Sequence, residues 1–261
     1  MGKDQTVLFH STIFGPIRSR RLGVSLGINL LPDDGKICSF DCVYCEAGYN
    51  KQGFGTTGMP TRERTRLDLR RKLEAMKDAG ETLDVITFSG NGEPTLHRDF
   101  ASIVDDVIAL RDEFYPNAKV SVLSNSTRIG DSNVAAALMR VDNNILKLDS
   151  AITSTMRLID QPTSDEFSCE RLIEHLKQFS SQCVIQTMML RGMHDGQRID
   201  NTTEEEINAL IEAYKKISPR EIMLYSIDRS TPEEQLEKVS VEELREIGKR
   251  IEKEGFKVQV N

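Results

Sequence analysis

The sequence predicts an α/β protein built as a partial (β/α)6 TIM-like barrel, with a parallel sheet that is open at one side. Two observations support this prediction. Six short apolar segments of strand length alternate with six longer segments of helical character, which is typical of a parallel sheet wound by right-handed crossovers. Eight such units close a barrel, so six units predict a barrel that stays open.

The expected elements follow one another without an internal linker, repeat or low-complexity tract. Strands are expected at residues 23–31, 83–89, 119–125, 145–149, 183–190 and 221–227. Helices are expected at residues 62–79, 100–114, 132–141, 169–179, 203–217 and 241–254. We expect one domain over residues 1–261, with a core at about 15–230. The C-terminal helix and an edge strand in the run FKVQV lie within residues 240–261.

The start of two helices is predicted from capping boxes, Thr202 with Glu205 and Ser240 with Glu243. In such a box the hydroxyl and the carboxylate satisfy backbone donors of the same turn. In the last helix, apolar residues recur at spacings of three and four, as one buried helical face requires. These residues are Val241, Leu244, Ile247 and Ile251.

Composition and charge limit the classes of protein to consider. Hydrophobic residues make up 38% of the chain and the formal net charge is −7, a globular composition without the basic excess usual in nucleic-acid binders. A local basic cluster within residues 62–72 is expected to be a solvated helix face. No apolar run reaches the length of a membrane span, and the N-terminal run MGKDQTVLFH does not resemble a signal peptide. A cytoplasmic location and no membrane partner are therefore expected.

Three cysteines in the run ICSFDCVYCE are the most informative feature of the sequence. Cys38, Cys42 and Cys45 can hold three corners of a [4Fe–4S] cube from one loop, whereas clusters that only transfer electrons take four cysteines. A cube with three protein ligands leaves one iron open, and an open position lets a metal bind a substrate. In a reducing compartment, clustered cysteines are more often metal ligands or redox groups than disulfides.

Three other interpretations of the cysteine run stay open. A zinc site needs a fourth ligand, for which His10 or His97 is available. A cluster with four cysteines would have to use Cys169 or Cys183, which are expected to be small buried apolar residues instead. A redox dithiol would use Cys42 and Cys45 and leave Cys38 without a role.

Polar residues fall at the carboxyl ends of the expected strands, where the chemistry of parallel α/β folds collects. The residues in question are Ser124, Asn125, Lys147, Asp149, Gln186, Tyr225, Asp228 and Arg229. The cysteine run follows the first strand, and the run SGNGE follows the second. The sequence thus predicts one site at this edge of the sheet.

The spacing Cys-x3-Cys-x2-Cys, with Tyr44 directly before the last cysteine, resembles the signature of the radical S-adenosylmethionine (radical SAM) superfamily. The resemblance implies that the open iron is chelated by the amino and carboxylate groups of S-adenosylmethionine. One electron from the reduced cluster then cleaves the sulfonium, and a 5′-deoxyadenosyl radical abstracts hydrogen from the substrate. Tyr44 would offer its ring or its backbone carbonyl to the adenine.

A second motif, FSGNGEPTLH, resembles the glycine–glycine–glutamate motif that follows the second strand in this superfamily. Gly90, Gly92 and Glu93 match the motif, and Asn91 is inserted between the glycines. The resemblance implies that this loop holds the ammonium of S-adenosylmethionine, since glycine lets the backbone approach a ligand closely.

Four more residues look like cofactor contacts of relatives. Lys147 and Asp149 resemble a lysine and an acid that contact the ribose or the carboxylate, and Ser124 and Asn125 are expected to do the same from the third strand. The alternative for each is a capping or turn role. His97 is either a donor to the substrate or a surface residue.

A narrower resemblance links the runs GPIRSRRLGVSLGINLLP, GNGEPTLH and LYSIDRSTPEE to the subgroup of wyosine-base synthetase-related Fe–S oxidoreductases. The tRNA-modifying members have three further cysteines upstream, but this chain has none before Cys38. Arg20 and Arg21, together with Arg18, are candidates to meet an anionic substrate. Tyr225 and Arg229 are the candidates from the sixth strand, because a guanidinium suits carboxylate and phosphate.

The sequence therefore predicts a radical SAM enzyme with one [4Fe–4S] cluster and S-adenosylmethionine. Its substrate would be a small molecule, a nucleotide or a peptide, and its electron donor a protein such as flavodoxin or ferredoxin. Two alternatives remain. One is an enzyme that modifies tRNA or another RNA, and the other is a non-catalytic iron–sulfur protein that senses redox state or carries electrons. The glycine-rich stretch 48–60 is either a lid or a passive loop.

Overall fold

The structure is a computed structural model that describes residues 7–19 and 23–261. Its main sheet has eight strands in the order β1-β2-β3-β4-β5-β6-β9-β11, and all neighbouring pairs are parallel except β1 with β2. The strands are β1 (Ile13–Ser19), β2 (Gly23–Ile28), β3 (Val85–Phe88), β4 (Lys119–Ser124), β5 (Asn143–Lys147), β6 (Val184–Met188), β9 (Glu221–Tyr225) and β11 (Val258–Val260). Strands β1 and β11 end the sheet at opposite sides, so the predicted open barrel is confirmed.

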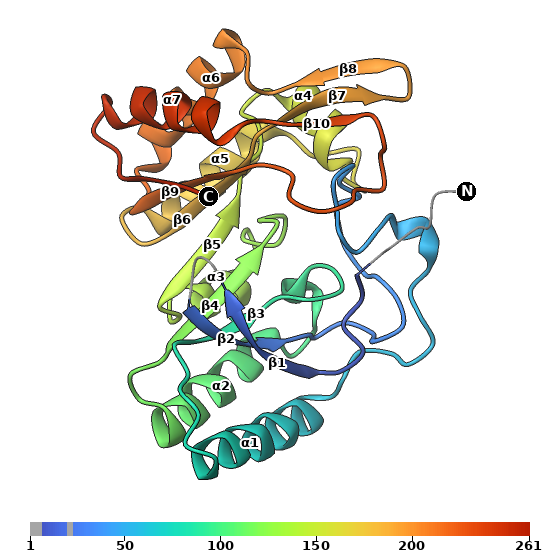
Figure 1. The fold of residues 1–261 in the computed structure, drawn as a ribbon, viewed down its shortest axis with the longest axis vertical. Helices are drawn as coiled ribbons and strands as arrows, with labels where there is room; N and C mark the ends of the chain where they lie inside the picture. The colour runs from blue at the N-terminus through green and yellow to red at the C-terminus, as the bar shows by residue number, and fades with distance from the viewer. Residues whose placement is uncertain (1–6, 20–22) are drawn as a thin grey trace.

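Helices cover the outside of this curved sheet. In Figure 1, α1 and α2 lie beside the N-terminal half of the sheet, and α6 and α7 lie beside the C-terminal half. The helices are α1 (Arg62–Asp78), α2 (Phe100–Phe114), α3 (Ser132–Leu138), α4 (Thr153–Asp160), α5 (Cys169–Leu176), α6 (Glu204–Ile217) and α7 (Val241–Glu252). Three short 3-10 turns occupy Asn50–Gln52, Pro94–Leu96 and Lys177–Phe179.

The core follows from the apolar strands and helix faces. One cluster of buried apolar side chains runs from Leu26 in β2 to Ile251 in α7. Strand β3 is buried along its whole length, as expected for a strand of a parallel sheet that is covered on both faces. The prediction of one domain over residues 1–261 stays a prediction.

Of the two predicted helix caps, one lies where it was expected and the other is displaced by one residue. Ser240 caps α7 by accepting a hydrogen bond from the backbone of Glu243. The predicted box of Thr202 with Glu205 is wrong by one residue, because Thr203 caps α6 and accepts from the backbone of Glu206. The hydroxyl of Thr202 instead donates to Asp200, which draws Thr202 into the turn before the helix.

Several elements have no counterpart among the predicted ones. A second sheet of order β10-β7-β8 contains β7 (Leu190–His194), β8 (Gln197–Asp200) and β10 (Leu236–Lys238). It lies at one end of the molecule, above the long loop that follows β2 (Figure 1). Strand β1 and helix α4 were also missed. These elements are short and mostly half-exposed, so they lack the apolar runs from which the central strands were predicted.

Candidate functional site

The cysteine loop leaves β2 at the carboxyl edge of the sheet and packs against the end of α4. The backbone N–H of Val43 donates to the carbonyl of Ile159 at 2.9 Å. Cys42 is buried, and Cys38 and Cys45 are half-buried. All three are free thiols on one loop.

The glycine-rich loop after β3 is joined to the cysteine loop by its backbone. The N–H of Ile37 donates to the carbonyl of Asn91 at 3.1 Å, and the N–H of Glu93 donates to the carbonyl of Ile37 at 3.0 Å. A Cβ on Gly92 would lie 1.9 Å from the Ile37 carbonyl oxygen, at a φ of +134°. Glycine is therefore required here by the cysteine loop itself, one residue before Cys38.

The Glu93 carboxylate fastens this loop to the end of β4. One oxygen accepts from the backbone and the hydroxyl of Thr95 and from the hydroxyl of Ser124, and the other accepts from the backbone of Asn125 at 2.6 Å. Burial raises the pKa of Glu93, although these four donors oppose the shift. The predicted contacts Glu93, Ser124 and Asn125 thus lie together.

Asn125 connects this group to the cluster loop. Its side-chain amide donates to Ser39 Oγ at 2.9 Å and lies 3.5 Å from Cys38 Sγ. The side chain of Asn91 has a different role. It pairs with both backbone groups of Phe9 and donates to the carbonyl of Pro32. The backbone of Asn91 is also engaged, because its N–H donates to Asn29 Oδ1 and its carbonyl accepts from the N–H of Ile37.

The predicted contacts Tyr44, Lys147 and Asp149 form a second group, beside Cys42. The Lys147 ammonium lies 3.0 Å from Asp149 Oδ2 and 4.7 Å from the centre of the Tyr44 ring. The Tyr44 hydroxyl donates to Asp149, and Lys147 donates to that hydroxyl. Burial alone would lower the pKa of Lys147, but Asp149 and further neighbouring groups raise it, so the ammonium stays charged.

Asp160 completes this second group and was missed in the sequence. It is fully buried at the end of α4 and accepts a hydrogen bond from the Cys42 thiol at 3.1 Å. Its Oδ2 has no hydrogen-bond partner among the described residues. Burial, and then the charge of Asp149, raises the pKa of Asp160. No sequence signal marks this residue, because it becomes a neighbour of Cys42 only when α4 docks on the loop.

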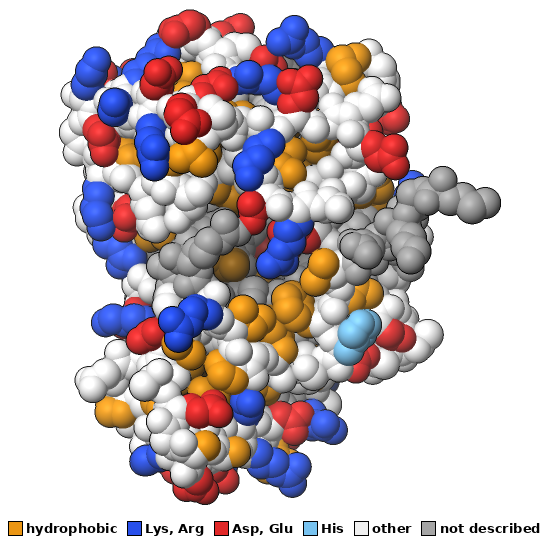
Figure 2. Space-filling view, in the orientation of Figure 1, with side chains coloured by type: hydrophobic (Ala, Val, Ile, Leu, Met, Phe, Trp, Pro, Cys, Tyr) orange, Lys and Arg blue, Asp and Glu red, His pale blue; other side chains and the backbone are white. Residues whose placement is uncertain are grey.

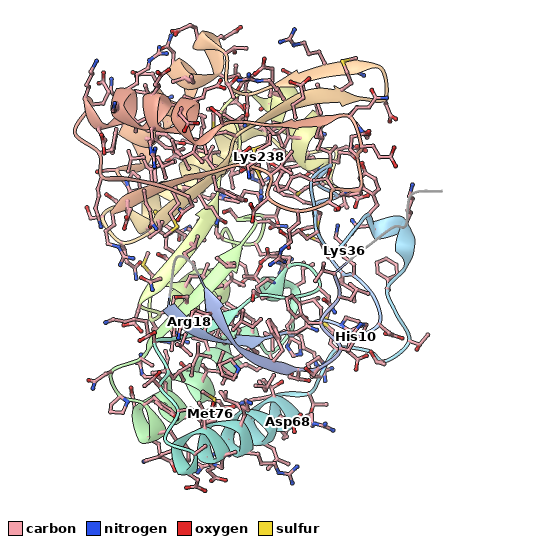
Figure 3. The ribbon with its side chains drawn as sticks, in the orientation of Figure 1. His10, Arg18, Lys36, Asp68, Met76 and Lys238 are labelled. Atoms are coloured by element: carbon pink, nitrogen blue, oxygen red, sulfur yellow. The ribbon has the colours of Figure 1, made fainter. Side chains whose placement is uncertain are left out.

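Lys36 is the other residue that the sequence analysis missed. Its side chain is 1% exposed, and its ammonium donates to the carbonyl of Gly48 at 2.6 Å and to Asp41 at 3.3 Å. Figure 3 places it within the long loop that follows β2. Burial alone would lower its pKa, but the three cysteines and Asp41 raise it. The loop therefore buries a positive charge beside the three sulfur atoms.

Three thiols on one loop are the donor type that iron–sulfur clusters use, although among the described residues no group of three His, Cys, Asp or Glu side chains is arranged to hold a metal ion. Burial raises the pKa of the Cys38 thiol to about 12 and that of Cys42 well above its ordinary value, so binding iron must displace protons from these thiols. The buried ammonium of Lys36 and the amide of Asn125 would stabilise the negative charge of a thiolate-bound cluster, whose potential responds to such groups.

The candidate substrate residues lie at the opening of the barrel, as far as they are described. Arg20 and Arg21 lie outside the described residues. Tyr225 and Arg229 line a pocket of about 160 Å³ that also includes Tyr44. Arg229 is held by an ion pair with Glu46 at 2.6 Å. The same arginine lines a larger cavity inside the barrel, together with Arg18 of β1.

Three alternatives raised by the sequence find ordinary structural explanations. His97 is buried rather than at the surface, with its Nε2 against the carbonyl of Pro60 and its Nδ1 accepting from the backbone of Asp99. Cys169 and Cys183 are fully buried in the core, as expected. Within the basic cluster, three arginines of α1 form ion pairs with acids. These pairs are Arg62–Asp106, Arg64–Asp68 and Arg70–Glu113.

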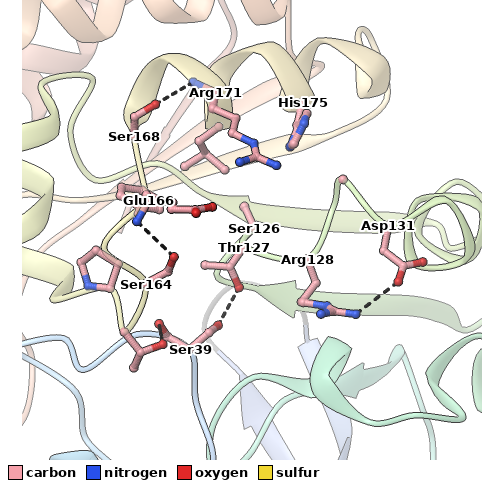
Figure 4. A pocket seen from close by; sticks show the side chains of 15 residues that line it. Ser39, Ser126, Thr127, Arg128, Asp131, Ser164, Glu166, Ser168, Arg171 and His175 are labelled. Atoms are coloured by element: carbon pink, nitrogen blue, oxygen red, sulfur yellow. Dashed lines mark hydrogen bonds and ion pairs between the residues drawn. The ribbon is translucent and has the colours of Figure 1, made fainter.

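A cavity of about 450 Å³ lies behind the cysteine loop, between the loop after β4 and helix α5. Figure 4 shows Arg171 and His175, both on α5, along one side of it and Arg128 and Ser39 on the other. Two acids, Asp131 and Glu166, also line it, so its formal charge is balanced. In the part of the chain that is described, no helix is both long enough and apolar enough to span a bilayer.

A family model described as the radical SAM superfamily matches residues 34–201. The chain belongs to this superfamily. A "UPF0026 protein" of Synechocystis is 31% identical over 228 residues, covering 84% of this chain and 77% of that protein. A protein of Brachyspira hyodysenteriae named "GTPase Obg" is 27% identical over 96% of this chain, but the match covers only 35% of that protein. This chain thus spans about a third of the Brachyspira relative.

Solved structures of radical SAM proteins share the fold. A radical SAM methyltransferase from Sphaerobacter thermophilus superposes with a TM-score of 0.69 and 15% identity, covering 91% of this chain and 65% of that one. SuiB of Streptococcus suis bound to S-adenosylmethionine superposes with a TM-score of 0.62 and 15% identity, and the match covers 90% of this chain and 50% of that one. TYW1 with a lysine-pyruvate adduct superposes with a TM-score of 0.59 and 15% identity, and the match covers 88% of this chain and 73% of that one.

The predicted superfamily, fold and enzymatic character are therefore confirmed. Membership of this superfamily implies a [4Fe–4S] cluster, S-adenosylmethionine and an enzymatic role. The residue assignments, the narrower subgroup and the substrate stay predictions.

Proposed function

We propose that Cys38, Cys42 and Cys45 each bind one iron of a [4Fe–4S] cluster, and that S-adenosylmethionine binds the fourth iron. The carrying observation is the pair of hydrogen bonds through Ile37, which holds the glycine-rich loop against the cysteine loop. These bonds bring the two loops together, so a ligand on the open iron would lie beside the glycine-rich loop.

Held by Cys38, Cys42 and Cys45, the cluster would supply the electron for reductive cleavage of S-adenosylmethionine, which releases methionine and provides radical hydrogen abstraction from the substrate. The protein supplies orientation and an environment that excludes water. Glu93 orients the glycine-rich loop through Thr95 and Asn125. Tyr44, beside the Lys147–Asp149 pair, offers a flat apolar face to the adenine.

We assign the substrate to the barrel opening and the electron to a reduced donor protein such as flavodoxin or ferredoxin. RNA modification is not favoured, because arginines of the basic helix face are paired with acids and the whole chain carries a formal charge of −7.

The test is anaerobic reconstitution with iron and sulfide, followed by reduction in the presence of S-adenosylmethionine. The wild-type protein should bind about four iron and four sulfide per chain, as the cube requires, and release 5′-deoxyadenosine. Cys42→Ala should lose the cluster and the release. Cys169→Ala is the matched control, since it removes a buried thiol away from the loop, and it should keep both.

Two results would overturn the proposal. One is a full cluster in Cys42→Ala, which would reject this ligand. The other is a loaded and reduced wild-type protein that leaves S-adenosylmethionine intact, which would favour an electron carrier or a sensor.

A further inference from the structure

The inside of the barrel holds a cavity of about 300 Å³, lined by side chains of β1 to β6 and β9. Closed eight-stranded barrels are filled by layers of side chains, but this open barrel is not filled. The volume lies at the lower end of the range for small-molecule sites. Figure 2 shows a hollow across the waist of this face, with apolar side chains exposed in it.

The inner wall of the cavity is apolar. Ile145, Val184 and Met223 form a small cluster separate from the main core, and Leu123 packs against it. Ile145, Met223 and Leu123 line the cavity, and the first two are almost fully buried, so a ligand there would contact apolar side chains. The opposite wall contains Phe14, whose ring lies so close to Gly27 that a Cβ there would be 2.1 Å away.

The polar groups of the cavity differ in whether they have partners. The hydroxyls of Ser25 and Thr87 bond to each other at 2.9 Å, so neither requires a ligand. The side chains of Gln186 and Arg18 form no hydrogen bond or ion pair with any described residue. Arg18 is exposed at the end of β1, which Figure 3 places at the edge of the open side.

The charged side chains that line the cavity are all basic among the described residues, although the chain as a whole is acidic. Arg18 and Arg229 line the cavity, and no aspartate or glutamate among the described residues does so, although the chain carries a formal charge of −7. Arg229 is neutralised by Glu46. Among the described residues, Arg18 is thus left without a counter-charge at the rim of this cavity.

We propose that the substrate is a small molecule with an apolar body and one anionic head group, a carboxylate or a phosphate, bound with the body inside the barrel and the anion at Arg18. This inference rests on the proposed function, because it assigns a substrate to the same barrel. A guanidinium at the rim can meet an anion through two parallel hydrogen bonds, and the apolar body gains by leaving water. Arg18 is the specificity-determining residue of this site.

The test measures binding of three probes with one apolar body to the cluster-loaded protein with S-adenosylmethionine. Equilibrium dialysis of hexanoate, hexyl phosphate and hexan-1-ol gives three dissociation constants. Hexanoate or hexyl phosphate should bind at least about tenfold tighter than hexan-1-ol, the size of one charged hydrogen-bonded pair. The tighter of the two anions identifies the head group.

Two arginine variants and one lining variant complete the design. Arg18→Gln should remove the preference for the anion. Arg245→Gln is the matched control, because Arg245 is also exposed and has no ion pair among the described residues but lies on α7, outside the barrel. It should keep the preference. Ile145→Thr should weaken all three probes, since it makes the inner wall polar.

Equal binding of hexan-1-ol and both anions to the wild-type protein would overturn the proposal. An unchanged preference in Arg18→Gln would do so as well. The proposed function is judged separately, by release of 5′-deoxyadenosine from the wild-type preparation. If that release fails, the comparison of the probes still decides whether the cavity selects anions.

Discussion

Replacing Glu93 by glutamine tests how the glycine-rich loop is held. The carboxylate accepts four hydrogen bonds, three on one oxygen and one, from the backbone of Asn125, on the other. A glutamine has one acceptor oxygen, so its NH₂ group must face one set of donors. The less costly orientation points the NH₂ group at the N–H of Asn125, which then loses its partner in a buried place.

A buried donor without a partner costs about 1–3 kcal/mol. We therefore expect Glu93→Gln to lower the free energy of unfolding by about 2 kcal/mol, measured by urea denaturation of the metal-free protein at pH 7.5. Glu206→Gln is the matched control. Glu206 is also buried, and it accepts hydrogen bonds from the hydroxyls of Ser150 and Thr155, which can rotate to suit an amide. Its replacement should change stability by less than about 1 kcal/mol, the usual range of a charge in the first turn of a helix.

The reasoning would be refuted if Glu93→Gln unfolded with the same free energy as the wild type. It would also fail if both variants lost the same amount, because burial alone would then explain the loss. A loss confined to Glu93→Gln would identify the backbone of Asn125 as the decisive donor.

Three further predictions concern stability and thiol reactivity. Gly92→Ala should lower the free energy of unfolding by several kcal/mol, because its Cβ would clash with the carbonyl of Ile37. Gly80→Ala should lower it by only about 1 kcal/mol, because a Cβ there meets open space and only the positive φ is unfavourable. Thermal unfolding of both variants checks this. Burial raises the pKa of Glu206 above its ordinary value of 4.5, so the native state binds more protons and wild-type stability should fall relative to Glu206→Gln as pH rises from about 4.5. A wild-type stability that rises relative to Glu206→Gln as pH increases would contradict the sign. In the folded metal-free protein at pH 8, iodoacetamide should label the half-buried Cys45. It should spare Cys169, because that thiol is fully buried and its pKa is raised to about 12. Mass spectrometry of the peptides measures the labelling, and early labelling of Cys169 would contradict its burial.

The strands of the main sheet were predictable because their apolar runs are local. Strand β3 is buried along its whole length, and β2 and β4 carry short apolar runs that are buried over at least half of their length. The antiparallel β1 was not predictable in this way. Its run contains Gly15 and Pro16 and is half-exposed, and its pairing with β2 appears only when the edge of the sheet is formed.

The cysteine spacing and the glycine-rich motif were also visible in the sequence, because both are local patterns along the chain. Their physical roles were only partly foreseen. The sequence suggested that Gly92 makes room for a ligand, but the structure shows that it makes room for the carbonyl of Ile37. Asn91 looked like an insertion into a cofactor motif, and its side chain proves to hold the N-terminal segment through Phe9.

The class of the protein could be recognised from the sequence, because the cysteine spacing and the alternation of strands and helices are local patterns along the chain. Only the tertiary structure decided what surrounds those cysteines. Lys36 and Asp160 become buried beside them through the folding of a long loop and the docking of α4. Among the described residues Arg18 has no ion-pair partner at the rim of the barrel, and this too is a property of packing, since a charge lacks a partner only relative to what folds around it.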